Sequence, residues 1–160
     1  MRQVFESENI YFVEVSEQLI PDYLVMVNDY ENVNRFIGAY QDTYSEEDEQ
    51  KWVRGKLEEK APVYSMIEKE TGEYIGNIEL MDVTPEQGEL GIAITAGKQE
   101  KGFGTEAIRA LIDHGKNRFG LKRIYLRANP DNSRAIHVYE KCGFKEYDRN
   151  EDHVYMELNT

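Results

Sequence analysis

A short glycine-rich segment in the second half of the chain has the composition of an anion-binding loop. Gly102-Phe103-Gly104 lies between an apolar, strand-like stretch and a segment with helical periodicity. Backbone N–H groups at the start of a helix have no partner within it, and glycine lets an anion approach them closely. We therefore expect a phosphate-bearing ligand at this loop.

Two common nucleotide-binding patterns can be compared with this loop. A P-loop needs a second glycine after four residues, followed by Lys and Ser or Thr, and this segment has none. The run Gly102–Ala107 does satisfy the dinucleotide fingerprint G-x-G-x-x-A. That fingerprint, however, expects an early βαβ unit with an acidic residue at the end of the next strand, and here that strand ends in Arg127-Ala128. We drop the first pattern and disfavour the second.

Other reactive side chains form no recognisable set. We find no metal-ligand spacing and no Ser-His-Asp arrangement, so no metal is expected. Cys142 is the only cysteine, which excludes an internal disulfide and fits a reducing cytoplasm. His114 and His137 have charged neighbours and are expected at the surface, whereas Trp52 is expected in the core.

Alternating and helical patterns predict the elements that must hold the loop. The fourth predicted helix has Asn132 as its cap, and the third ends before Gly120. The expected strands are 10–15, 63–68, 74–83, 89–95, 123–127, 144–147 and 153–158, with helices after Ser16, after Ser45, over 104–119 and over 133–142. This order predicts a mixed α/β (α+β) sheet in one domain spanning residues 1–160.

The net charge of −12 is unevenly distributed along the chain. Residues 98–145 carry 11 Lys and Arg against 5 Asp and Glu, whereas the remainder carries 8 against 26. The acidic balance argues against a nucleic-acid partner, and no apolar run is long enough for a membrane helix. The basic segment could hold a polyanion while the rest attracts a cation, although an acidic surface can also serve solubility alone.

Several segments resemble the GNAT superfamily of N-acetyltransferases. Gln99-Glu100-Lys101-Gly102-Phe103-Gly104 is similar to the family motif Q/R-x-x-G-x-G/A, and residues 129–144 resemble its second motif. Residues 28–35 and 76–80 are similar to the branch that contains ribosomal-protein N-terminal and spermidine acetyltransferases. The resemblance covers nearly the whole chain and is strongest over residues 89–144.

The resemblance implies acetyl-coenzyme A as the cofactor. It implies that the loop holds the pyrophosphate through its N–H groups, and that the strand at 90–95 pairs with the amide-containing arm where it splays from the strand at 123–128. A backbone N–H near residues 92–94 would polarise the acetyl carbonyl. The implied cofactor-binding set is Ile92, Ala93, Ile94, Gln99, Glu100, Lys101, Gly102, Phe103, Gly104, Thr105, Asn132 and Lys141.

Three side chains are expected to carry the chemistry. By resemblance, Tyr139 faces the cofactor sulfur; as a phenol it is a reluctant acid, so we expect it to act through a hydrogen bond that strengthens as charge builds on sulfur. An attacking ammonium must first lose a proton, and Glu79 and Glu89 are the candidate acceptors, with Glu89 narrowly favoured because the family often has an acid there. The alternatives for each are that it binds the amine's positive charge or that it faces solvent.

The sequence thus predicts a cytoplasmic N-acetyltransferase that acts by direct attack of an amine in a ternary complex. The expected acceptor is a small cationic, polyamine-like amine or a basic protein N-terminus, with no nucleic acid and no membrane as partner. Homo-oligomerisation is left open. The alternative is an acyl-CoA-binding sensor with the same fold and no turnover.

Overall fold

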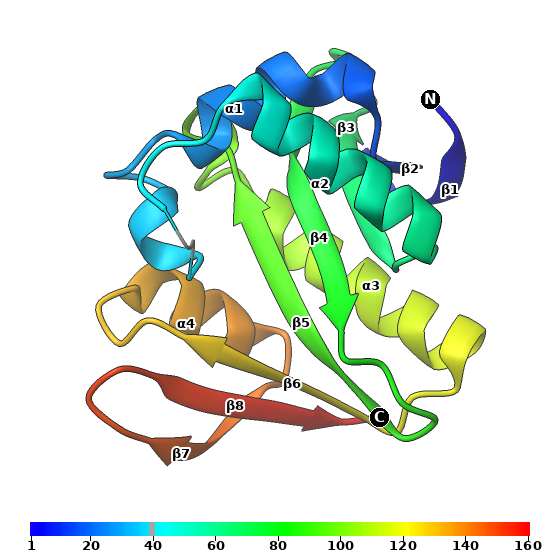
Figure 1. Cartoon of the computed structure of the whole chain (residues 1–160). Coiled ribbons are helices and arrows are strands. Elements are labelled where there is room, and N and C mark those ends of the chain that lie inside the picture. The colour runs from blue at the N-terminus through cyan, green and yellow to red at the C-terminus, as the bar shows by residue number, and fades with distance from the viewer. Residues whose placement is uncertain (39–40) are drawn as a thin grey trace.

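Alternating apolar residues build a sheet that runs through the whole molecule (Figure 1). The computed structural model describes residues 1–38 and 41–160, in which the strands follow the order β1-β2-β3-β4-β5-β6-β8-β7. Neighbouring strands are antiparallel except β5 and β6. The strands are β1 (Gln3–Glu6), β2 (Ile10–Glu14), β3 (Val63–Glu68), β4 (Tyr74–Met81), β5 (Gln87–Ile94), β6 (Arg123–Ala128), β7 (Lys145–Arg149) and β8 (Val154–Asn159).

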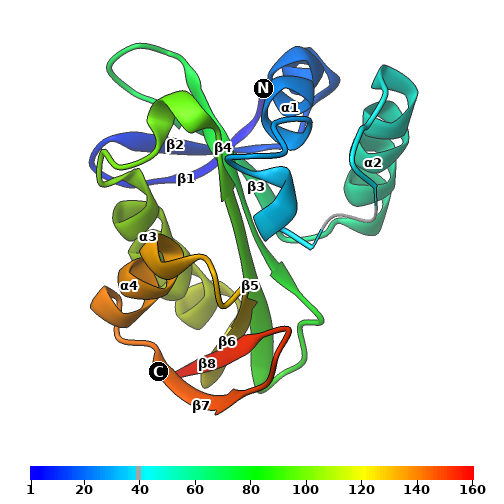
Figure 2. The same cartoon turned by 90° about the vertical axis from the view of Figure 1, so that its left-hand side faces the viewer.

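Helices cover both faces of the sheet (Figure 2). One apolar cluster fills the space under α3 and α4, and a second lies under α1 and α2. The helices are α1 (Ile20–Val27), α2 (Glu46–Glu59), α3 (Phe103–Phe119) and α4 (Ser133–Lys141), with 3-10 turns η1 (Glu17–Leu19), η2 (Asn34–Phe36) and η3 (Ala96–Lys98). The predicted mixed, mostly antiparallel sheet flanked by helices is confirmed.

The helix ends lie close to where local sequence signals put them. Ser45 and Asp48 form a capping box at the start of α2, with N–H to side-chain distances of 3.2 and 2.8 Å. Gly120 ends α3 in the left-handed region at φ 68°, and Asn132 caps α4 through the N–H of Ala135. Ser16 instead caps the short turn η1, and α1 begins directly after it at Ile20, with Pro21 in its first turn.

The N-terminal strand β1 was not predicted, and its presence changes the role of one histidine. Phe5 of β1 stacks on Phe12 and on His114, with ring centroids 4.2 and 4.1 Å apart. His114 also shares a 3.1 Å hydrogen bond with the Tyr64 hydroxyl, and burial lowers its pKa. His114, which was expected at the surface, is therefore half-buried, because Phe5 of β1 covers part of its ring.

The parallel pair β5–β6 is short, and this shapes the site. Only Gln87, Gly88 and Glu89 pair with β6. Residues 90–94 stay bonded to β4 on one side, and on the other side no strand of the described residues pairs with them. The two strands diverge toward the carboxyl end of β5, as Figure 1 shows. The predicted splay is confirmed.

Candidate active site

Backbone donors at the loop between β5 and α3 are free. None of the N–H groups of residues 100–105 donates a hydrogen bond to any residue within 1–38 or 41–160. Gly102 has φ 90° and Glu100 φ 60°, so left-handed residues precede the helical ones, as in the backbone nests that bind anions. The loop therefore offers consecutive donors and the positive end of α3 to an anion.

The side chain of Gln99 braces this loop within the protein. Its Nε2 donates to the carbonyl oxygens of Ile94 at 2.8 Å and Asn32 at 3.2 Å, and its Oε1 accepts from Arg134 Nη2 at 2.6 Å. Arg134 Nη1 also lies 3.4 Å from the Glu100 carboxylate. Gln99 thus ties the loop to β5, to the segment after α1 and to α4. Sequence reasoning missed Arg134.

The lysines beside the loop differ in availability. Lys98 Nζ lies 2.7 Å from carboxylate oxygens of both Glu68 and Glu73, so it anchors η3 to the β3–β4 turn. Lys101 is exposed and has no ion pair with the described residues. Of these two lysines, only Lys101 has a charge that is free to contact an anion.

The open edge of β5 presents small and branched side chains alternately to the two faces. Ile92 and Ile94 pack on the cluster under α3, whereas Ala93 packs on the cluster under α1 and α2. A methyl group built on Gly104 would lie 3.4 Å from Ile94 and 3.8 Å from Val138, so α4 lies beside the end of this strand. The expected arm-binding residues and the loop therefore adjoin one another.

Tyr139 lies on α4 and is almost completely buried. Its ring packs edge-on against Phe144 at 6.2 Å, and its hydroxyl makes no hydrogen bond to any described residue. Burial raises the pKa of Tyr139 to about 12. The hydroxyl is therefore a protonated donor without a partner. Asn132, which begins the same helix, uses its side-chain oxygen as the cap.

The two candidate acids lie on the same face of the sheet in different surroundings. Glu89 is buried and accepts from Arg127 Nε at 3.0 Å. Glu79 lies opposite Gly91, against which its side chain packs, and has no ion pair within 4 Å among the described residues. Burial raises the pKa of Glu79; Lys56 opposes this shift, and Glu89 adds to it. Glu79 is thus the less encumbered proton acceptor.

A buried polar chain lies next to Glu79 and was not anticipated. Ser65 Oγ donates to Asn77 Oδ1 at 2.8 Å, so the Tyr23 hydroxyl must donate to Ser65 Oγ, 2.6 Å away. The Asn77 Nδ2 group has no partner among the residues described. Asn77 and Glu79 alternate on one face of β4, opposite Ala93 and Gly91. Their two-residue spacing was the only sequence signal.

A scan against protein-family models matches residues 9–145 to the acetyltransferase (GNAT) domain. The chain belongs to this family. As a GNAT protein it is an acetyl-CoA-dependent N-acetyltransferase. No helix in the described part of this GNAT protein has the length and apolar character needed to span a bilayer.

Curated GNAT relatives include spermidine N(1)-acetyltransferases. The enzyme from Vibrio cholerae is 31% identical over 120 residues, which cover 72% of this chain and 69% of that one. The enzyme from Escherichia coli is 35% identical over 75 residues, covering 46% of this chain and 40% of that one. The chain thus spans less than half of the second relative.

Solved structures with the same fold include two GNAT enzymes. An acetyltransferase from Bacillus anthracis has a TM-score of 0.85 at 18% identity, with 96% of each chain covered. Spermidine N-acetyltransferase from Vibrio cholerae, in complex with CoA and spermine, has a TM-score of 0.80 at 19% identity, again with 96% of each covered. At these identities the likeness concerns the fold.

The loop and the open edge fit the cofactor of the GNAT family. Unpaired N–H groups at residues 100–105 suit a pyrophosphate, and unpaired backbone groups along residues 90–93 suit amides. Acetyl-CoA carries both of these groups. The Ile94 carbonyl is not available to a cofactor amide, because it already accepts a hydrogen bond from Gln99.

Proposed function

We propose that this enzyme acetylates a primary amine of a small polycation of the polyamine class. The carrying observation is Glu79, a carboxylate with no ion-pair partner among the described residues that lies over Gly91 beside the open edge of β5. The acidic balance outside residues 98–145 and the names of the curated relatives support the same acceptor. A basic protein N-terminus is the second candidate, and the same excess of acidic residues outside 98–145 supports it.

Backbone groups do most of the binding in this proposal. The N–H groups of residues 100–105 hold the pyrophosphate, and Lys101 adds a positive charge. Free backbone groups of residues 90–93 hold the amides of the arm. Acetyl-CoA supplies an activated acetyl thioester. Gln99 and Arg134 keep the loop in register with β5 and α4, and Asn132 and Lys141 complete the set on α4.

Two side chains handle protons. Glu79 accepts the proton of the acceptor ammonium, directly or through water, and burial brings its pKa closer to that of the amine. Tyr139 keeps its proton and offers a hydrogen bond to a sulfur on which negative charge develops. Glu89 is assigned to holding Arg127 and the β5–β6 junction rather than to proton transfer. Attack by the amine is direct, within a ternary complex.

Thiol release with a panel of amines tests the proposal. Purified enzyme with acetyl-CoA is given spermidine, a monoamine of similar length, or a short peptide with a free N-terminus, and free thiol is followed. Spermidine should give the highest kcat/KM because it carries several charges. A higher kcat/KM for the peptide than for spermidine would show that the acceptor is a protein N-terminus instead of a polyamine. Stabilisation by CoA without thiol release from any amine would favour the sensor.

The single, partly buried Cys142 supports a cytoplasmic setting.

A further inference from the structure

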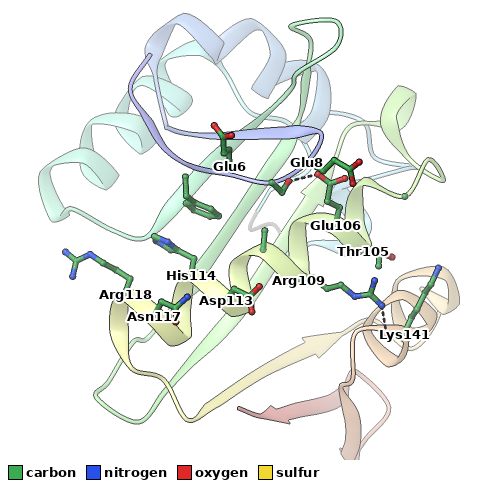
Figure 3. A pocket seen from close by; sticks show the side chains of 14 residues that line it. Glu6, Glu8, Thr105, Glu106, Arg109, Asp113, His114, Asn117, Arg118 and Lys141 are labelled. Carbon is green, nitrogen blue, oxygen red and sulfur yellow. Dashed lines mark hydrogen bonds between the residues drawn. The ribbon is translucent and has the colours of Figure 1, made fainter.

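A groove of about 930 Å³ runs along the outer side of α3, from the loop at Gly102 toward His114 (Figure 3). At its α4 end it is lined by Gly102, Thr105, Arg109 and Lys141. The free N–H donors of the loop therefore open into the same groove as two basic side chains. Nothing in the proposed catalysis uses Arg109.

Arg109 and Lys141 have charges that are available to a ligand. Neither forms an ion pair with a carboxylate among residues 1–38 and 41–160, although Asp113 lies one turn beyond Arg109 on α3. Arg109 Nη2 donates to the backbone oxygen of Lys141 at 3.3 Å, which brings the guanidinium to the end of α4. Figure 3 shows the two side chains next to each other.

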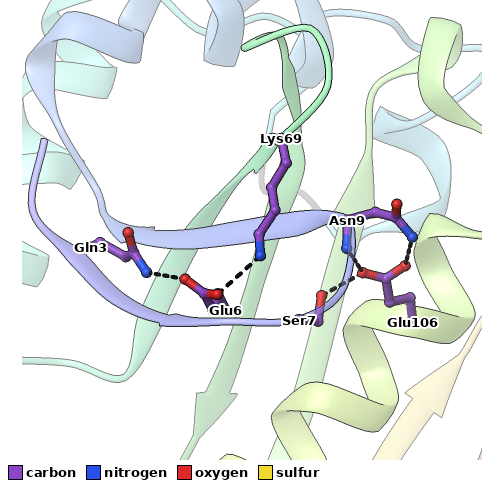
Figure 4. A network of polar contacts seen from close by, with 6 residues as sticks. All are labelled: Gln3, Glu6, Ser7, Asn9, Lys69 and Glu106. Atoms are coloured by element: carbon purple, nitrogen blue, oxygen red, sulfur yellow. Dashed lines mark hydrogen bonds and ion pairs between the residues drawn. The ribbon is translucent and has the colours of Figure 1, made fainter.

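Of the acids that line the groove, Glu106 and Glu6 are already bound, whereas Glu8 and Asp113 have no ion pair among the described residues. Glu106 accepts from the Ser7 hydroxyl and from the backbone and side-chain N–H groups of Asn9, the latter two at 2.8 Å (Figure 4). Glu6 is bound by Lys69 at 3.0 Å. Beside α4 itself the charged lining side chains are Arg109 and Lys141, which suits a second anionic group there.

We propose that Arg109 and Lys141 bind the 3′-phosphate of the cofactor and let the enzyme distinguish CoA from 3′-dephospho-CoA. The inference rests on the proposed function, since it takes the pyrophosphate to lie at residues 100–105. Arg109 is one helical turn beyond Thr105, about 6 Å along the axis, and so within reach of a phosphate on the adjoining ribose. Arg and Lys are the usual cationic partners of phosphate.

Calorimetry with CoA and 3′-dephospho-CoA tests the proposal without turnover. The two ligands differ only in the 3′-phosphate, so the parent enzyme should bind CoA about tenfold more tightly, the size of one charge-assisted contact near solvent. Arg109→Gln and Lys141→Gln should each weaken CoA binding toward the dephospho level and leave dephospho-CoA binding unchanged. The KM values for the two acetyl donors should follow the same pattern.

Arg118→Gln is the matched control, because Arg118 lines the same groove about 13 Å further along α3. It should leave the preference intact. Equal binding of both ligands by the parent, or an equal loss for both in Arg109→Gln and Lys141→Gln, would overturn the assignment. Failure of the proposed function looks different, since thiol release would then be missing with every amine while the binding preference stays measurable.

Discussion

Burial favours the neutral form of two side chains in the site, and it does so for two different purposes. Tyr139 keeps a proton that it can share, whereas Glu79 becomes a stronger base than a solvated carboxylate. Glu89 shows the contrast: it is also buried, but a 3.0 Å bond to Arg127 uses its charge. The surroundings, more than the residue type, assign the roles we propose.

Replacing Tyr139 by Phe should lower kcat about tenfold to a hundredfold, the cost of one hydrogen bond to a developing charge. CoA affinity should change little, because the ring still packs on Phe144. Thiol release gives kcat and calorimetry gives the affinity. A variant that turns over as fast as the parent would remove Tyr139 from the chemistry.

Replacing Glu79 by Gln should change the pH profile. In the proposed role the active form is the carboxylate, whose pKa lies above the usual 4.5, so kcat/KM of the parent should fall as the pH drops through that raised value. The variant should be slower and lack this acidic limb. Glu89→Gln is the control and should mainly lower the Tm, since it leaves Arg127 without its partner. An unchanged acidic limb in Glu79→Gln would contradict the role.

At the scale of elements, the start of α3 is held by segments that are distant in sequence. Ser7 and Asn9 of the β1–β2 turn bind Glu106 in the first turn of the helix (Figure 4). Arg134 of α4 donates to the side chain of Gln99. Burial alone would raise the pKa of Glu106, but the hydrogen bonds from Ser7 and Asn9 more than offset this and lower it. These contacts therefore hold the loop in place and leave its own backbone N–H groups available to a ligand.

Gly102→Ala should strain the loop, because φ is 90° there while no atom lies within 4 Å of an added methyl. We expect a cost of about 1–2 kcal/mol and a Tm lower by about 2–8 °C, with weaker CoA binding. Gly97→Ala is the control, with equal space and no positive φ. Thermal melts with and without CoA measure both effects. Equal behaviour of the two variants would show that the left-handed geometry is unimportant.

At the scale of the whole molecule, one sheet connects both termini, and we propose that residues 1–160 act as one domain. Charge is divided across this domain, with the positive surplus in residues 98–145 and the negative surplus elsewhere. We propose that residues 98–145 attract the anionic cofactor and that the acidic remainder attracts the cationic acceptor.

The KM for spermidine should therefore rise when the salt concentration is raised from about 0.03 M to about 0.3 M, because salt screens attraction between exposed charges. A monoamine that carries a single charge should show a much weaker dependence. Steady-state kinetics at constant pH measure both. A salt-independent KM for spermidine would mean that the acidic surface serves solubility only.

The sequence was most informative where the signal is local. The cap at Asn132, the stop at Gly120 and the glycine loop follow from neighbouring residues, and the GNAT resemblance led to the fold. Features that depend on distant partners were not predictable. β1 became visible only through its pairing with β2, and the bond between Glu89 and Arg127 only through the β5–β6 junction.

The three residue pairs that join β5 to β6 have a mechanical consequence. They form the only strand-to-strand connection between the β1–β5 plate and the β6–β8 plate within the described residues, and beyond them the two plates are joined by side-chain packing under α3 and α4. A ligand bonded to the edge of β5 and also held by α4 would therefore add a connection between the two plates beyond these three residue pairs.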